Sequence, residues 1–147
     1  VSVTELTEQA YQLVAVSMDL RDIRWKCHVE PGCSFQGDLS WSVEAVGNIL
    51  KNCMEYSQPG GAITVEGTEN PLYTELMIRD EGKGIAPEDL PHLFERFYRG
   101  KHNSTESVGI GLSLAQKIIT QQNGTIQVKN GTKRGAVFTI RFYKSVI

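Results

Sequence analysis

The stretch Leu72-Tyr-Thr-Glu-Leu-Met-Ile-Arg-Asp80-Glu-Gly-Lys-Gly84 decides how this sequence can fold. Alternate residues of a strand share a face, so the apolar positions from Leu72 to Ile78 lie on the same side as the Asp80 carboxylate. Burial of a carboxylate is costly unless a partner satisfies it. Asp80 is therefore either a turn residue that caps the next loop or an acceptor for a ligand donor, such as the exocyclic amine of adenine. Gly82 and Gly84 leave room for a flat ring or for close backbone approach.

Apolar periodicity places further elements around this strand. Helical spacing is found in the segments 4–19, 38–57 and 109–122. Strand patterns are found in the segments 23–29, 33–36, 62–69, 72–80, 125–130 and 136–143. Ser2 or Thr4 is a candidate cap for the first helix, and Pro87 is placed to begin a short additional one. This order predicts one α+β domain over residues 1–147, with helices on one face of a mixed sheet.

Composition and charge exclude several classes of function. The chain has 147 residues and a formal net charge of −2, which argues against a broad surface for nucleic acid. No apolar run approaches the roughly 18 residues that a membrane helix needs. The start at Val1, without a signal-peptide pattern, indicates a segment of a longer chain. Three cysteines favour a reducing compartment, and Cys27-His28 with Cys33 lacks a fourth ligand at zinc-like spacing.

Asn48 and Asn52 form a second candidate site on the longest helix. They are four residues apart and therefore on one face, with Tyr56 one turn further along. Single asparagines beside an apolar stripe are often only solvent-exposed residues at the border of the buried helix face. An amide oxygen also suits magnesium, which takes its remaining ligands from water and phosphates. Two aligned amides and a phenol favour a polar site.

The motif Gly109-Ile110-Gly111-Leu112 opens the last helix. Free N–H groups and the helix dipole at this point favour a phosphate, although glycines also begin helices without any ligand. The motif is shorter than the dinucleotide-binding fingerprint and follows no strand, so a Rossmann fold is excluded.

The segment Phe94-Glu-Arg-Phe-Tyr-Arg99 combines aromatic rings with arginines, and Lys101 follows it. The phenylalanines can simply pin a surface helix to the core. Arg99 and Lys101 are either solvated charges or the cations that bind a polyphosphate.

Together and in this order, the motifs resemble the catalytic and ATP-binding domain of bacterial sensor histidine kinases, part of the GHKL superfamily. The resemblance extends from about Leu6 to Tyr143. The family's N box, first glycine box, F box, second glycine box and last glycine–phenylalanine element correspond to Asn48–Ser57, Asp80–Ile85, Phe94–Arg99, Gly109–Leu114 and Gly135–Phe138. The resemblance implies a Bergerat-type two-layer sandwich: a mixed, mostly antiparallel sheet of about five strands under about three helices. It also implies a mobile ATP lid over about residues 84–108.

The resemblance implies a role for each matching residue. Asp80 would accept from the adenine amine, with Gly82 and Gly84 beside the ring. Asn52 would bind the magnesium that bridges the phosphates, and Asn48, Asn52 and Arg99 would be the catalytic residues. The other residues implied to bind ATP are Ile49, Tyr56, Ile85, Lys101, Gly109, Ile110, Gly111, Leu112 and Phe138.

Three positions depart from the family pattern. Glu55 stands where a lysine is common, which would weaken nucleotide binding or shift the positive charge to Arg99 and Lys101. Ser107 stands where the second glycine box often begins. Cys53 replaces a common alanine and is interpreted as a packing variation.

The implied activity is transfer of the γ-phosphoryl group from magnesium-ATP to a histidine on a separate dimerisation domain. His28, His92 and His102 do not lie in such an acceptor motif. The implied partners are that domain and a response regulator, with no nucleic acid. The resemblance further implies a homodimeric parent in the cell membrane, with this domain on the cytoplasmic side and monomeric when alone.

Two alternatives remain at this point. A GHKL-type ATPase would need a glutamate base at the position of Asn48, and an amide cannot act as a base at neutral pH. A degenerate nucleotide sensor that binds without phosphotransfer is supported mainly by Glu55.

Overall fold

The computed structural model describes residues 1–95, 111–132 and 135–145. The helices in this part of the chain are α1 (Val3–Gln12), α2 (Ala15–Leu20), α3 (Leu39–Tyr56), the short 3-10 helix η1 (Leu90–His92) and α4 (Gly111–Thr120). The strands are β1 (Arg24–Val29), β2 (Ala62–Glu69), β3 (Tyr73–Arg79), β4 (Gly124–Asn130) and β5 (Ala136–Tyr143). Among the described residues, no helix combines the length and apolar character needed to cross a membrane.

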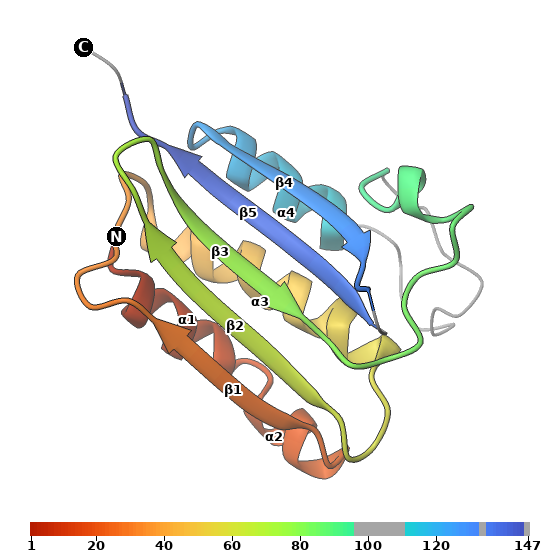
Figure 1. The fold of residues 1–147 in the computed structure, drawn as a ribbon. Helices are drawn as coiled ribbons and strands as arrows, with labels where there is room; N and C mark the ends of the chain where they lie inside the picture. The colour runs from red at the N-terminus through yellow and green to blue at the C-terminus, as the bar shows by residue number, and fades with distance from the viewer. Residues whose placement is uncertain (96–110, 133–134, 146–147) are drawn as a thin grey trace.

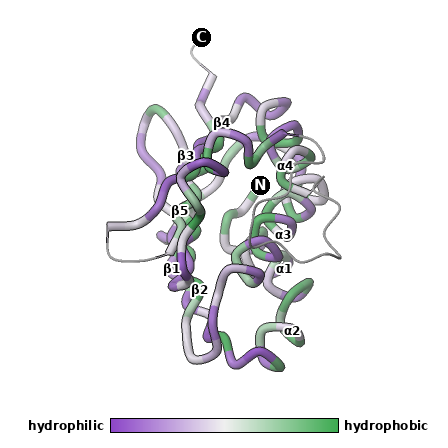
Figure 2. Tube along the Cα trace, turned by 90° about the vertical axis from the view of Figure 1, so that its right-hand side faces the viewer, coloured by the Kyte–Doolittle hydropathy of each residue, from purple (hydrophilic) through white to green (hydrophobic). Residues whose placement is uncertain are grey.

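The five strands form one sheet in the order β1-β2-β3-β5-β4. β1 runs parallel to β2, and the other neighbours are antiparallel. Helices α1, α3 and α4 lie together on one face of this sheet (Figure 1). Seen edge-on in Figure 2, the sheet and the helices make two layers. The predicted α+β sandwich with a mixed, mostly antiparallel sheet is confirmed.

Alternation along β3 explains how the two layers are joined. Thr74, Leu76, Ile78 and Asp80 are all buried, so the predicted face is the one beneath the helices. Leu72 lies before the strand begins and is 66% exposed, which corrects its assignment to that face. The core therefore ends on a carboxylate at the carboxyl end of β3.

The predicted helix over 4–19 is wrong in its middle, because the chain breaks into α1 and α2. Ser2 caps α1 by accepting from the Glu5 N–H. The N–H groups of Leu13 and Val14 turn back to the carbonyls of Ala10 and Tyr11, and Val14 leaves the helical region at φ −123° and ψ −4°. The break buries Val14, which is 1% exposed.

Two shorter elements also differ from the sequence prediction. Residues 33–36 form no strand, and only a single bridge joins Ser34 to Ser2. Pro87 begins no helix: residues 87–89 form a turn, and the one short helix there is η1. Both segments are too short for the local pattern to determine their conformation.

Candidate functional site

Asp80 is the centre of the candidate site, immediately after β3. It is 3% exposed, and its Oδ1 accepts hydrogen bonds from the N–H groups of Gly82 (2.9 Å) and Ala136 (3.2 Å). Its Oδ2 is buried, and no N–H or O–H donor of the described residues reaches it. One oxygen thus holds the local backbone, and the other is available to a ligand.

Burial raises the pKa of Asp80, because the charged form loses its hydration. The hydrogen bonds from Gly82 and Ala136, and the adjoining Cys53 thiol, oppose this shift. Cys53 is itself fully buried, and burial followed by the Asp80 charge raises its pKa well above the usual value. Cys53 is therefore a neutral thiol against the carboxylate, a contact that its interpretation as a packing variation missed.

Two glycines allow the backbone to close around Asp80. A Cβ on Gly82 would lie 1.8 Å from the carbonyl oxygen of Tyr56, at the end of α3. Gly135 has φ +84°, and a Cβ there would lie 1.9 Å from the Asp80 carbonyl oxygen. Any side chain at these positions would push the loop away from α3 or from β5. The first glycine box is thus packed against the N-box helix.

Asn130, at the end of β4, holds the next part of this loop and was missed by the sequence analysis. Its Oδ1 accepts from the Ile85 N–H (2.7 Å), and its Nδ2 donates to the Ile85 carbonyl oxygen (2.8 Å). Gly84 has φ +82°, and its Cβ position would lie 2.8 Å from the Asn130 Oδ1. The sequence carries no signal for this contact, because Asn130-Gly131 resembles an ordinary turn and lies 45 residues from Ile85.

Asn52 provides a second unsatisfied oxygen on the C-terminal half of α3. Its Oδ1 is buried and has no hydrogen-bond partner among the described residues. One turn earlier lies Asn48, and a Cβ on Gly111 would sit 3.7 Å from the Cβ and Cγ of Asn48. The start of α4 therefore lies against this part of α3, which brings Gly111 of the second glycine box next to the N box.

The predicted apolar wall belongs to a single buried cluster. Its members are Ile49, Ile85, Leu112 and Phe138, which are at most 8% exposed. Tyr56 is also buried, at 4% exposed, on the last turn of α3. These residues come from α3, the loop after β3, α4 and β5, so the fold brings together motifs that are far apart in the sequence.

Glu55 lies on the last turns of α3, close to a positive charge outside the predicted site. Burial raises the pKa of Glu55, and the Arg21 guanidinium partly offsets the shift. Arg21 also donates to the Met54 carbonyl oxygen at 2.7 Å. Glu55, which stands where the family pattern often has a lysine, thus has the Arg21 cation from the end of α2 beside it.

Some predicted site residues lie outside the described part of the chain. They are Arg99, Lys101, Gly109 and Ile110, together with residues 96–108 of the predicted lid, Ser107 among them. Of the F box, Phe94 is half-buried against the core.

The two buried oxygens without hydrogen-bond partners among the described residues, Asn52 Oδ1 and Asp80 Oδ2, indicate which ligand groups this site can bind. A buried acceptor without a partner carries a desolvation cost that a ligand donor or a cation can remove. The Asp80 oxygen suits an N–H donor, and the neutral Asn52 oxygen suits a hard cation such as magnesium. Both lie at the C-terminal end of α3, since Cys53, which follows Asn52, contacts Asp80.

Residues 37–145 match the family described as histidine kinase-, DNA gyrase B-, and HSP90-like ATPases. The chain belongs to this family. Its relatives include the sensor histidine kinase YvrG of Bacillus subtilis, 35% identical over 119 residues, and the sensor histidine kinase RppB of Synechocystis, 31% identical over 143 residues. The alignments cover 80% and 95% of this chain but only 20% and 31% of those proteins.

Solved structures agree with this membership. The mycobacterial sensor histidine kinase MprB is 28% identical, with a TM-score of 0.82 over 97% of both chains. A structure of the catalytic domain of histidine kinase ThkA has a TM-score of 0.86 at 21% identity, which shows the shared fold. The resemblance to a histidine-kinase ATP-binding catalytic domain is thereby confirmed.

Proposed function

We propose that this domain binds magnesium-ATP and transfers the γ-phosphoryl group to a histidine on a separate dimerisation domain of its parent sensor kinase. The observation that carries the proposal is the buried Asp80 carboxylate, which presents one unsatisfied oxygen beside the N-box helix of an ATPase-family fold. The names of the relatives, sensor histidine kinases, support the phosphotransfer step.

Asp80 selects the base by hydrogen-bond polarity. Adenine presents an exocyclic N–H donor, which the unsatisfied Oδ2 of Asp80 accepts. Guanine presents an acceptor at the same place, so an ionised Asp80 disfavours it by roughly 2 to 3 kcal/mol. The backbone N–H groups on Oδ1 keep the carboxylate oriented.

Asn52 fits a magnesium ligand, because its buried amide oxygen has no hydrogen-bond partner in the part of the chain that the structure describes. When bound, magnesium neutralises phosphate charge and so favours phosphoryl transfer. Asn48 lies beside Asn52 and next to the start of α4. Arg99 and Lys101 supply positive charge to the phosphates in this proposal, and Gly109, Ile110 and Gly111 supply backbone N–H groups.

The nucleophile comes from outside this domain. Asn48 cannot take a proton from water at neutral pH, so rapid hydrolysis is not expected. His28 and His92 are exposed on β1 and η1, and His92 contacts Glu95 at 2.7 Å. The domain therefore holds ATP in place for an imidazole that the parent's dimerisation domain delivers.

A labelling experiment tests the proposal. The domain is mixed with γ-labelled ATP and the parent's dimerising helical segment, and acid-labile label is expected on that segment alone. Label on His28, His92 or His102, or rapid phosphate release by the domain alone, would overturn the assignment. Transfer from the parent to a response regulator, a homodimeric parent and its place in the cell membrane remain predictions.

The alternative is a domain that binds the nucleotide without transferring phosphate. Glu55 favours this alternative, because an acid stands at a position where the family pattern often has a lysine. The charge beside Glu55 is the Arg21 guanidinium. Full-length parent that binds ATP but leaves its own histidine unlabelled would support this alternative.

A further inference from the structure

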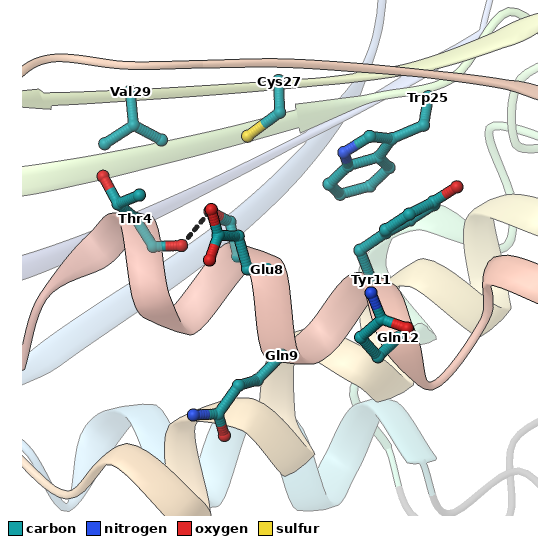
Figure 3. A pocket seen from close by; sticks show the side chains of 9 residues that line it. Thr4, Glu8, Gln9, Tyr11, Gln12, Trp25, Cys27 and Val29 are labelled. Atoms are coloured by element: carbon teal, nitrogen blue, oxygen red, sulfur yellow. Dashed lines mark hydrogen bonds between the residues drawn. The ribbon is translucent and has the colours of Figure 1, made fainter.

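A groove between α1 and β1 lies apart from the Asp80 site. It has a volume of about 690 Å³ and is lined by Thr4, Glu8, Tyr11, Trp25, Cys27 and Val29, among others. Figure 3 shows Trp25, Cys27 and Val29 pointing from the strand toward the helix. Trp25 stacks on Tyr11 with ring centroids 4.6 Å apart, so the groove has an aromatic side that remains half-exposed.

The strand above this groove has an unpaired edge. β1 pairs only with β2 in the sheet. The N–H groups of Arg24 and Glu30 donate to β2 or to residues beside it, so the even-numbered residues face that strand. The N–H and C=O groups of Trp25, Cys27 and Val29 therefore point outward, and no backbone hydrogen bond to them is formed by the described residues.

Two positive charges lie on the opposite face of β1, and the acid of β2 on that face, Glu66 opposite His28, is already ion-paired with Arg79. Arg24 and Lys26 are exposed on the open face of the sheet, and the residues beside them on β2 are Ala62 and Thr64. Lys26 has no ion-pair partner in the described part of the chain. The groove face itself contains one acid, Glu8, and no base.

We infer that the free edge of β1 is a docking site for an extended acidic segment of another polypeptide. A strand added at this edge would meet the outward backbone groups of Trp25, Cys27 and Val29. Its alternate side chains would enter the groove, where Trp25 and Tyr11 favour apolar residues. The intervening side chains would lie beside Arg24 and Lys26, where acidic residues are favoured.

A second copy of this chain is the competing occupant. Registers of a β1–β1 pair that set Arg24 or Lys26 opposite a base of the other copy are destabilised by like charges, whereas a register centred on Cys27 would set Arg24 opposite Glu30 and is distinguished by its dependence on protein concentration. The other edge strand, β4, has α4 packed against it, and its exposed Lys129 provides a matched control.

The test uses Trp41→Phe as the background, so that Trp25 is the sole tryptophan. Two synthetic probes are compared: a seven-residue peptide with alternating Glu and Val, and its counterpart with Lys for Glu. We expect the acidic peptide to change Trp25 fluorescence and to slow amide exchange at Trp25, Cys27 and Val29. Its affinity should exceed that of the basic peptide by about fivefold to tenfold, as two exposed charge pairs allow.

Charge reversal makes the test specific. Arg24→Glu with Lys26→Glu should reverse the preference between the peptides, whereas Lys129→Glu should leave it unchanged. Equal binding of both peptides, no protection of the three amides, or protection that grows with protein concentration without peptide would overturn the proposal. Unchanged ATP binding by the double variant separates this result from any failure of the proposed kinase function.

Discussion

The two ends of α3 bury polar groups in opposite ways. At the N-terminal end, Asp38 caps the helix at the Trp41 N–H, and its own N–H donates to Gln122 Oε1. Ser42, 1% exposed, exchanges hydrogen bonds with the Gln122 side chain. At the C-terminal end, Asn52 Oδ1 and Asp80 Oδ2 are buried without such partners among the described residues. The polar groups at one end are satisfied by the protein itself, whereas the other end leaves two buried oxygens without a described partner.

Asp80→Asn should have the largest effect on this contrast. The amide places an N–H donor against the adenine amine, so ATP affinity should fall about 100-fold. Isothermal titration with ATP, ADP and GTP measures the loss. Gln122→Ala, at the satisfied end, is the matched control: it should lower Tm and leave ATP affinity within about twofold. Unchanged ATP affinity in Asp80→Asn would remove Asp80 from adenine recognition.

The same substitution should stabilise the empty domain at neutral pH. Burial raises the Asp80 pKa, so the native state favours the protonated acid, and its contribution to stability is lost as pH rises through that pKa. Asp80→Asn removes the penalty. We expect its Tm to exceed that of the parent at pH 7, with the difference shrinking as pH falls. Thermal scans of both proteins over a pH series measure it, and a gap that widens toward low pH would contradict the cause.

Asn52→Ala should weaken ATP binding about tenfold, and only when magnesium is present. Titrations with magnesium and with EDTA separate the metal contribution from that of the base. Asn52→Asp retains an oxygen ligand and should keep the magnesium dependence. If Asn52→Ala bound magnesium-ATP as tightly as the parent does, the assignment of Asn52 as a magnesium ligand would be wrong.

Asn130→Ala tests whether the loop around Ile85 is part of the ligand end. Loss of its two hydrogen bonds should weaken ATP binding by roughly threefold to tenfold and lower Tm by about 2 to 5 °C. Asn130→Ser, which keeps a short polar side chain, should recover part of both. A Tm loss without any change in affinity would make Asn130 a residue of the fold alone.

Glu55→Lys should have the smallest effect, a gain in ATP affinity of at most about 1 kcal/mol, because solvent screens the charge. Glu55→Gln is the neutral control and should give about half the gain. Titrations at low and high salt measure the difference. A gain that persists at high salt would show that the effect is not one of charge.

Local patterns predicted the parts of the site that lie within one element. Alternation in β3 was enough to place Asp80 at the end of the buried face, and the spacing of Asn48 and Asn52 was enough to align them on α3. The same local patterns failed where a distant contact decides. Val14 breaks the first helix because the core receives its side chain, and Ser34 pairs with Ser2 alone.

The roles of Asn130 and Cys53 illustrate what no local pattern contains. Asn130 would be interpreted as a turn residue in any sequence, since its two bonds to Ile85 exist only after β4 has paired with β5. Cys53 differs from alanine by one thiol, and its position against Asp80 depends on how α3 packs over β3. Motif resemblance selected Asp80 and Asn52 as candidate site residues because the family pattern already includes the three-dimensional neighbours.

The parallel pairing of β1 with β2 has a consequence for the order in which the chain folds. β2 with β3 and β4 with β5 are hairpins between neighbours in sequence, whereas α3 separates β1 from β2. Closing that connection costs more chain entropy than closing the β2–β3 hairpin, so β1 should join β2 only after this hairpin has formed. By the same reasoning it should detach early under mild denaturation, which makes the edge strand the first region to open while the nucleotide end of α3 is still intact.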